Sequence, residues 1–302
     1  MAPACRPDQM IGLPPVRDRT GSPRWFVDAL ARRPEHSDID VAGARVHFRA
    51  WGARGAPGLV LVHGGGANSA WWDHIAPFFA ADHRVVALDL SGHGDSGHRD
   101  AYGLARWADE VAAVAAAGGM SGGPVVVGHS LGGWVTATVA ANYDVAGVVV
   151  VDSRVDHQPA DEQPVRASAR EVRHYPHKET ILGRFRTMPE QEVLLPYVVR
   201  HIAEESVRLE QDGWTWKFDR RIFAARALLG ELLASLTCRV GFLRCEFGVV
   251  NEQTVAELEV LLGGRGLILD LPAAGHHPML DQPLALVTAL RAVLGHWVLP
   301  RC

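Results

Sequence analysis

The sequence lacks the features that mark membrane, secreted and disulfide-rich proteins. It has no uninterrupted apolar run of the roughly 18 residues that a membrane-spanning helix needs, and residues 1–20 hold no continuous apolar stretch of the signal-peptide type. Its four cysteines form no CxxC pair, so neither a disulfide framework nor a zinc framework is indicated. We therefore expect a cytoplasmic protein with reduced thiols and no contact with membranes.

An excess of charge of one sign is also missing. The 302 residues carry 30 Lys and Arg against 34 Asp and Glu, a formal net charge of −4, with no long run of either sign. Because nucleic acids are bound through clustered basic side chains, no nucleic-acid partner is expected. Apolar residues make up 48% of the chain, which is enough for a substantial core in one large domain with an insertion, or in at most two domains.

The chain does contain a regular alternation of short apolar runs and longer helix-compatible segments. A short helix over 25–31 and a hairpin over 39–51 come first. Apolar runs follow at 59–62, 85–88, 125–127, 148–151, 240–243 and 267–271, and helices are predicted over 71–80, 104–117, 131–142, 252–262 and 283–297. Continuous apolar strands that alternate with helices indicate an α/β fold, with a mostly parallel, doubly wound sheet of about eight strands.

This alternation is interrupted after Asp152. Residues 154–235 contain no strong strand run. Helix-like pieces occur near 178–186 and 194–210. A helical insertion into the sheet is the economical interpretation. The predicted divisions are a leader (1–35), a core (36–153 and 236–302) and the insertion (154–235).

The most informative motif is Gly128-His129-Ser130-Leu131-Gly132, which lies between the apolar run that ends at Val127 and the helix predicted from Leu131. A sharp turn from strand to helix strains the serine backbone, and the flanking glycines allow strand and helix to approach closely. Ser130 Oγ is then held at a helix N-terminus, where the Leu131 N–H can face a developing negative charge. Gly-x-Ser-x-Gly alone is common by chance, but the strand before it and the helix after it make it specific.

A serine hydroxyl is a weak nucleophile and needs a base within hydrogen-bond reach, itself oriented by a third group. His276 follows the strand at 267–271 through the turn 272–275, so it is expected at the same edge of the sheet as Ser130. His277 is adjacent. We prefer His276 because Gly275 would leave that position free to turn toward the pocket.

Four stretches in this order resemble those of α/β-hydrolase-fold enzymes of the esterase, lipase and epoxide-hydrolase-like type. They are His63-Gly64-Gly65-Gly66, Asp89-Leu90-Ser91-Gly92-His93-Gly94-Asp95-Ser96, the run Gly128 to Gly133, and Gly275-His276 followed by Asp281-Gln282-Pro283. The resemblance implies that Gly65 supplies a second oxyanion N–H beside that of Leu131. It also implies that 154–235 is a cap.

The acid of the implied triad is where the sequence departs from this family. The usual aspartate position after the strand at 240–243 holds Gly248. Asp152, at the end of the strand at 148–151, and Glu246 are the candidates that remain. We prefer Asp152, because some branches of the family place the acid after that earlier strand.

Other groups carry weaker signals. His83, His93 and His98 with Asp89 and Asp95 lack the spacing of a metal site, so no metal is expected. Gly64–Gly66 is not followed by Gly-Lys-Ser/Thr, so neither a nucleotide nor another cofactor is expected.

The tryptophans near these motifs are packing residues in the simplest interpretation, but some of them follow the oxyanion loop or lie in the insertion. The candidates for contact with the substrate are Gly64, His129, Trp71, Trp72, Trp214 and Trp216.

The sequence therefore predicts a metal-independent serine hydrolase that cleaves a carboxylic ester or lactone through Ser130, His276 and Asp152, with an acyl-enzyme intermediate. Its partner is expected to be a small-molecule ester, lactone or related acyl compound, and a homodimer is left open. One alternative is hydrolysis of a C–C bond in a diketone-like compound by the same triad. The other is a ligand-binding or signalling protein that keeps the fold with little turnover.

Overall fold

The computed structural model describes residues 21–155, 172–224 and 229–298. Its centre is an eight-stranded sheet, which confirms the predicted fold class. In spatial order the strands are β1 (Glu35–Val41), β2 (Ala44–Trp51), β4 (Arg84–Leu88), β3 (Pro57–Val62), β5 (Ser121–His129), β6 (Gly147–Val151), β9 (Arg239–Phe247) and β10 (Gly266–Gly275). β1 and β2 form an antiparallel hairpin and β2 is antiparallel to β4, whereas every other neighbouring pair is parallel.

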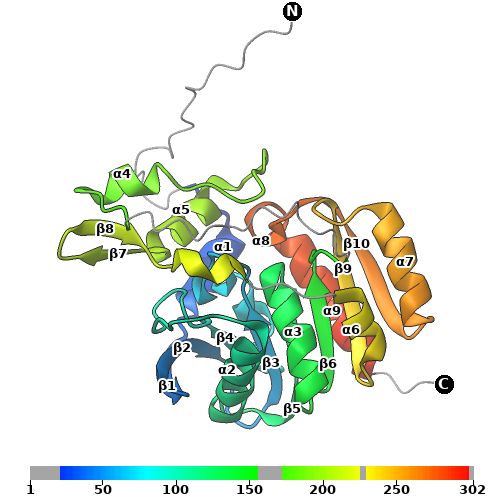
Figure 1. Ribbon diagram of the computed structural model, residues 1–302. Coiled ribbons are helices and arrows are strands. Elements are labelled where there is room, and N and C mark those ends of the chain that lie inside the picture. Colours follow the sequence, from blue (N-terminus) through cyan, green and yellow to red (C-terminus); the bar gives the residue numbers. More distant parts are fainter. Residues whose placement is uncertain (1–20, 156–171, 225–228, 299–302) are drawn as a thin grey trace, which may run out of the picture.

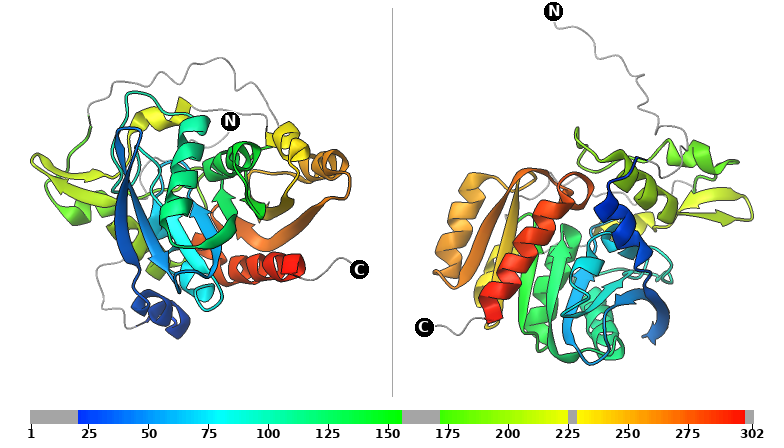
Figure 2. Two further views of the ribbon diagram at one scale, coloured as in Figure 1. Left: turned by 90° about the horizontal axis from the view of Figure 1, so that it is seen from below. Right: turned by 180° about the vertical axis from the view of Figure 1, so that it is seen from behind.

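Helices cover both faces of the sheet, as the continuous apolar strands predict. α1 (Arg24–Ala31) and α9 (Pro283–Val298) lie on one face, and α2 (Leu104–Ala117), α3 (Leu131–Asn142), α6 (Leu229–Ser235) and α7 (Glu252–Leu262) lie on the other (Figures 1 and 2). Each face has its own apolar core, one centred on side chains such as Trp72 and Leu290 and the other on Trp107 and Phe242. None of the helices in the described residues is both long enough and apolar enough to cross a membrane.

Two local predictions in the core are wrong. The helix predicted over 71–80 is instead two short 3₁₀ turns, η1 (Ser69–Trp72) and η2 (Ala76–Phe78), because Pro77 cannot donate the backbone hydrogen bond that a continuous helix needs. The turn predicted over 272–275 is the irregular end of β10, where the register against β9 shifts and Ala273 has φ 55°. This irregularity brings the following residues over the end of the sheet.

The segment between β6 and β9 contains a hairpin as well as helices. Its described elements before α6 are α4 (Lys178–Leu182), α5 (Pro196–Glu205), β7 (Val207–Glu210), β8 (Gly213–Trp216) and η3 (Arg220–Ala224). The helix predicted over 194–210 therefore ends at Glu205. The reason is tertiary packing, because Val207 at the start of β7 is buried with Tyr175, Ile181 and Leu182 in a separate apolar cluster.

This inserted segment, residues 172–224 of the described chain, lies at one end of the sheet (Figure 1). A buried arginine joins it to the core, since Arg49 on β2 donates to Asp73 at 2.7 Å and to Glu205 on α5 at 2.8 Å. His201 on α5 also lies 3.0 Å from the Asp73 carboxylate. The network fixes α5 over the loop that follows β3.

Candidate active site

Ser130 occupies a strained turn between β5 and α3. Its backbone has φ 53° and ψ −119°, a left-handed conformation that non-glycine residues adopt rarely. A Cβ at Gly128 would lie 2.0 Å from the carbonyl oxygen of Gly132, and a Cβ at Gly132 would lie 2.5 Å from that of Val62. Both glycines are therefore required by the close approach of backbone groups, which places Ser130 Oγ at the first turn of α3.

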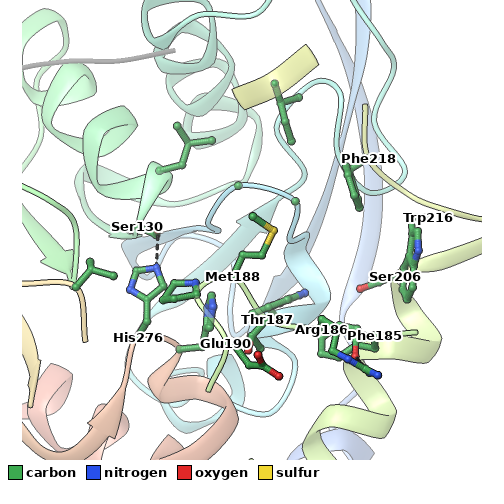
Figure 3. A pocket seen from close by; sticks show the side chains of 18 of the residues that line it. Ser130, Phe185, Arg186, Thr187, Met188, Glu190, Ser206, Trp216, Phe218 and His276 are labelled. Atoms are coloured by element: carbon green, nitrogen blue, oxygen red, sulfur yellow. Dashed lines mark hydrogen bonds between the residues drawn. The ribbon is translucent and has the colours of Figure 1, made fainter. Parts of the chain in front are cut away.

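His276 links this serine to a carboxylate. Its Nε2 lies 3.1 Å from Ser130 Oγ (Figure 3). Its Nδ1 lies 2.7 Å from Asp152 Oδ2. Because an ionised carboxylate only accepts hydrogen bonds, Nδ1 carries the proton in this arrangement and Nε2 is left as the acceptor for the serine hydroxyl. This is the geometry that a general base needs.

Asp152 is fully buried at the end of β6, with φ 44°. Its Oδ1 accepts a hydrogen bond from the backbone N–H of Cys245 at 3.2 Å, and its Oδ2 accepts one from that of Val249 at 2.9 Å. These bonds from the end of β9 and the loop after it fix the carboxylate in the orientation that reaches His276.

Gly248 explains how the carboxylate of Asp152 fits. A Cβ at this position would lie 2.2 Å from Asp152 Oδ2, far inside van der Waals contact. The site expected to hold an aspartate is thus filled by a carboxylate from the neighbouring strand, and a side chain at 248 would exclude it. Glu246, the other candidate acid, is exposed and accepts a hydrogen bond from the Ala273 N–H at 2.7 Å.

Gly275 has a different role from the one predicted. It is part of β10, and a Cβ there would lie 2.4 Å from Cδ of Gln191 in the inserted segment. The Gln191 Oε1 also accepts a hydrogen bond from the N–H of His277 at 3.0 Å. Glycine is needed at position 275 for this close contact, through which Gln191 supports the backbone around His276.

Two neutral histidines flank His276. Burial first, and the neighbouring His276 second, lower the pKa of His277 to about 3, and neither of its ring nitrogens has a hydrogen-bond partner of good geometry within the described chain. Burial likewise holds the pKa of His129 well below its usual range, with further contributions from His276 and His277. His129 Nε2 lies 2.7 Å from the backbone carbonyl of His276, so it donates to that group and supports it.

Ser130 and His276 open onto a cavity of about 940 Å³. Gly65, Leu131, Trp71 and Trp216 line it, whereas Gly64, His129, Trp72 and Trp214 are not among the residues that line it. Trp72 is completely buried in the core, and Trp214 packs beside Lys178 in the hairpin region. Other walls come from Trp134, Arg154, Arg184, Phe185, Arg186, Thr187, Met188, Pro189, Glu190, Ser206, Phe218, Ile222 and Val249 (Figure 3).

Sequence reasoning missed most of these wall residues. Trp134 could have been found, because it follows Ser130 by four residues and so lies one helical turn along the same face. The stretch 184–190 has no periodicity that points to the site. Ser153 was also missed, and its Oγ donates to the backbone carbonyl of Ser130 at 2.7 Å.

Two groups of potential metal ligands occur in the described part of the chain. In the first, formed by His129, His276 and His277, both nitrogens of His276 already face Ser130 and Asp152. In the second, His47 lies with Asp89 and Asp95, and Asp89 accepts backbone hydrogen bonds from Ser69 at 2.6 Å and Asp95 at 2.8 Å. Because His276 and Asp89 are engaged in these contacts, we assign no metal role to either group.

Comparison with known proteins identifies the family of this chain. Residues 59–290 match the model of a family described as the alpha/beta hydrolase family. An esterase of Mycobacterium tuberculosis (strain ATCC 25618 / H37Rv) is 29% identical over 265 residues, which cover 84% of this chain and 87% of that protein. A bifunctional esterase/perhydrolase of Acinetobacter calcoaceticus is 40% identical over 103 residues, 33% of this chain and 37% of that protein. A thioesterase domain from the curacin biosynthetic pathway has the same fold, with a TM-score of 0.72 at 20% identity over 86% of this chain and 99% of that one.

Proposed function

This chain belongs to the alpha/beta hydrolase family, and we propose that it is a serine hydrolase that cleaves carboxylic esters. The observation that carries the proposal is the continuous hydrogen-bonded line from Ser130 Oγ through His276 to Asp152, at 3.1 Å and 2.7 Å, at the wall of a large cavity. Similarity to one esterase over 84% of the chain supports the same chemistry.

In the proposed reaction, His276 Nε2 takes the proton of Ser130 as Oγ attacks the ester carbonyl carbon. The carbonyl oxygen becomes an oxyanion that accepts hydrogen bonds from the backbone N–H groups of Leu131 and Gly65. Leu131 is the first residue of α3, and its N–H has no acceptor within the helix. When the tetrahedral intermediate collapses, the bond to the alcohol oxygen breaks and His276 returns the proton to the leaving alcohol.

The resulting acyl-enzyme is hydrolysed by water in the same way. His276 removes a proton from the water, the hydroxide adds to the acyl carbon, and Ser130 Oγ leaves with the proton that His276 held. Asp152 stabilises the imidazolium in both halves of the reaction. Because His129 and His277 remain neutral, no like charge opposes that imidazolium.

We assign the inserted segment the role of a cap that selects the substrate. Phe185, Met188 and Trp216 give the cavity apolar walls on this side, as expected for the acyl or alcohol part of an ester. A lactone is a cyclic ester and would follow the same steps, so it falls within the proposed chemistry.

The test combines covalent labelling with turnover. A fluorophosphonate should label wild-type protein at Ser130, the Ser130→Ala variant should not be labelled, and short-chain 4-nitrophenyl esters should be hydrolysed by the wild type alone. Labelling with turnover of lactones alone would narrow the assignment to cyclic esters. Labelling with turnover only of diketone-like compounds, by cleavage of a C–C bond, would replace the ester assignment. A protein that is neither labelled nor active on any of these substrates would contradict the hydrolase proposal.

A further inference from the structure

We propose that the preferred substrate is an ester that carries a carboxylate or similar anion away from the bond that is cleaved, and that Arg154 and Arg184 bind this anion. The inference rests on the proposed esterase function, because it concerns the same cavity. It adds the charge of the substrate, which neither the catalytic geometry nor the family supplies.

Three arginines from two parts of the chain line the cavity. Arg154 comes two residues after Asp152 at the end of β6, whereas Arg184 and Arg186 belong to the stretch that follows α4. All three are exposed, and Figure 3 shows Arg186 across the cavity from Ser130. An anion would therefore be held between the core and the inserted segment.

These guanidinium groups have no carboxylate partner within the described residues. Arg186 donates only to the backbone carbonyl groups of Gly183 and Phe185, at 3.3 Å and 2.6 Å. No side-chain hydrogen bond or ion pair occupies Arg154 or Arg184 in the part of the chain that the structure describes. Their donors are free to meet a ligand.

Arginines elsewhere in the core behave differently. Arg49 pairs with Asp73 at 2.7 Å, Arg84 with Glu35 at 2.8 Å, and Arg99 with Glu110 at 2.9 Å. Each of these three arginines has a carboxylate partner. Among the described residues, the exposed arginines at the cavity have none.

The local charge is also opposite to that of the whole chain. The formal net charge of the protein is −4, yet the charged residues of the described chain that line the cavity are three arginines and one carboxylate, that of Glu190. Glu190 forms no ion pair with them among the described residues. An excess of positive charge at the cavity of a negatively charged protein attracts and orients anionic ligands.

The chemistry of arginine suits a carboxylate or another anion with two adjacent oxygens. A guanidinium keeps its charge at all physiological pH values, and its planar fork of N–H donors matches the two oxygens of a carboxylate. Neither Arg154 nor Arg184 forms a hydrogen bond with the side chains of Ser130, Asp152 or His276 in the described structure, so we assign neither arginine a part in the proton transfers.

The experiment compares matched esters that differ in charge. Mono-4-nitrophenyl adipate carries the anion on the acyl side, with 4-nitrophenyl hexanoate as its neutral partner. 4-(Hexanoyloxy)benzoate carries it on the alcohol side, with its methyl ester as the neutral partner. For at least one pair, kcat/KM of the acidic ester should exceed that of the neutral ester by roughly tenfold or more, as expected for a charge-assisted hydrogen bond.

Substitution of the arginines then tests whether they cause the preference for acidic esters. Arg154→Gln and Arg184→Gln should each reduce the ratio of kcat/KM for the acidic and neutral esters by roughly 5- to 50-fold, mainly through KM of the acidic ester. Arg33→Gln is the matched control, because Arg33 is exposed and does not line the cavity. Turnover of the neutral esters with no preference for the acidic ones, or a preference that survives both substitutions, would overturn the inference while leaving the esterase proposal intact.

A binding measurement makes the result independent of turnover. The cavity is lined by Trp71, Trp134 and Trp216, so ligand binding to the Ser130→Ala variant can be followed by tryptophan fluorescence. Adipate should bind more tightly than hexanamide, and the difference should fall when Arg154→Gln is added. Equal affinities would reject the anion site even if no ester proved to be a substrate.

Discussion

The two parts of the candidate site face one cavity but are built in different ways. Ser130 and Asp152 stand at the ends of adjacent strands, where their backbone N–H groups bond to the carbonyl groups of Val151 at 3.0 Å and Leu243 at 2.8 Å. The wall from the inserted segment consists instead of side chains on loops and on a hairpin, and Met188 there is 82% exposed. Backbone hydrogen bonds of the sheet hold Ser130 and Asp152 in fixed positions. Side chains of the inserted segment can be replaced without moving these two residues.

From this difference we expect the two parts to have separate functions. Changes at the strand ends should affect the chemical step, because a small displacement there breaks the line from serine to carboxylate. Changes in the inserted segment should affect which substrate is bound. The following predictions test this division, from the largest expected effect to the smallest.

Ser130→Ala should abolish hydrolysis without altering the fold, because it removes the nucleophilic oxygen and leaves the backbone turn in place. The loss in kcat should be about 10⁴- to 10⁶-fold. Active-site titration and far-UV circular dichroism on the same preparation would check both parts. Retention of more than a tenth of wild-type activity in contaminant-free protein would rule out the serine mechanism.

Asp152→Asn should lower kcat by about 10²- to 10⁴-fold, because an amide cannot hold His276 in the required tautomer or stabilise its imidazolium. Glu246→Gln is the matched control and should keep most activity, since Glu246 contacts only the backbone N–H of Ala273 among the described residues. Steady-state kinetics of the two variants would decide between the acids. The reverse ranking would assign the role to Glu246.

Gly248→Ala should reduce kcat by roughly tenfold or more, since its Cβ would lie 2.2 Å from Asp152 Oδ2 and must displace that carboxylate from His276. Gly295→Ala in α9 is the control, because a Cβ there meets no atom within 4 Å and should leave activity unchanged. Comparison of kcat, KM and melting temperature would separate a displaced acid from general unfolding. Unchanged kcat in the first variant would show that Asp152 does not need its observed position.

Trp216→Ala should change KM and acyl-chain preference, by roughly 3- to 30-fold, more than it changes kcat on the smallest ester, because Trp216 lines the cavity. Trp214→Ala is a close control two residues away in β8, and it should lower thermal stability without altering chain-length preference. A series of 4-nitrophenyl esters of increasing length, measured with both variants, would test the division between the two tryptophans. Equal effects would indicate that the whole hairpin moves together.

Asp281→Asn should give a small gain in stability that is absent at pH 3 to 4 and complete just above pH 6. Burial raises the pKa of Asp281 to about 6, so the folded protein resists its ionisation. A raised carboxyl pKa contributes no penalty below the unfolded value near 3.8; stability is lost as the pH rises from about 3.8 to about 6 and then stays constant. The melting temperature of the variant relative to wild type should therefore rise by a few degrees between pH 4 and pH 7. Asp28→Asn, on the surface of α1, should show no such change, and a pH-independent difference for Asp281→Asn would contradict the assignment.

Local sequence signals were sufficient for most of the sheet and its helices. The helices predicted over 104–117, 131–142 and 252–262 begin and end at those residues in the structure. Their boundaries depend on neighbouring residues, such as Gly103 before α2, Ser130 before α3, and Asn251 and Gly263 on either side of α7. The Gly-x-Ser-x-Gly turn is equally local, because its glycines are needed for contacts made within and beside the turn itself.

Tertiary structure decided what depends on distant parts of the chain. Sequence alone left Asp152 and Glu246 as alternative acids, and the contact that distinguishes them joins residues 152 and 276, which are 124 positions apart. It also could not separate Trp214 from Trp216, nor reveal that Gly275 is needed because Gln191 packs against it. Periodicity and turn residues report the conformation of a segment, whereas these features arise only when the sheet closes and brings distant segments within hydrogen-bond and van der Waals distance.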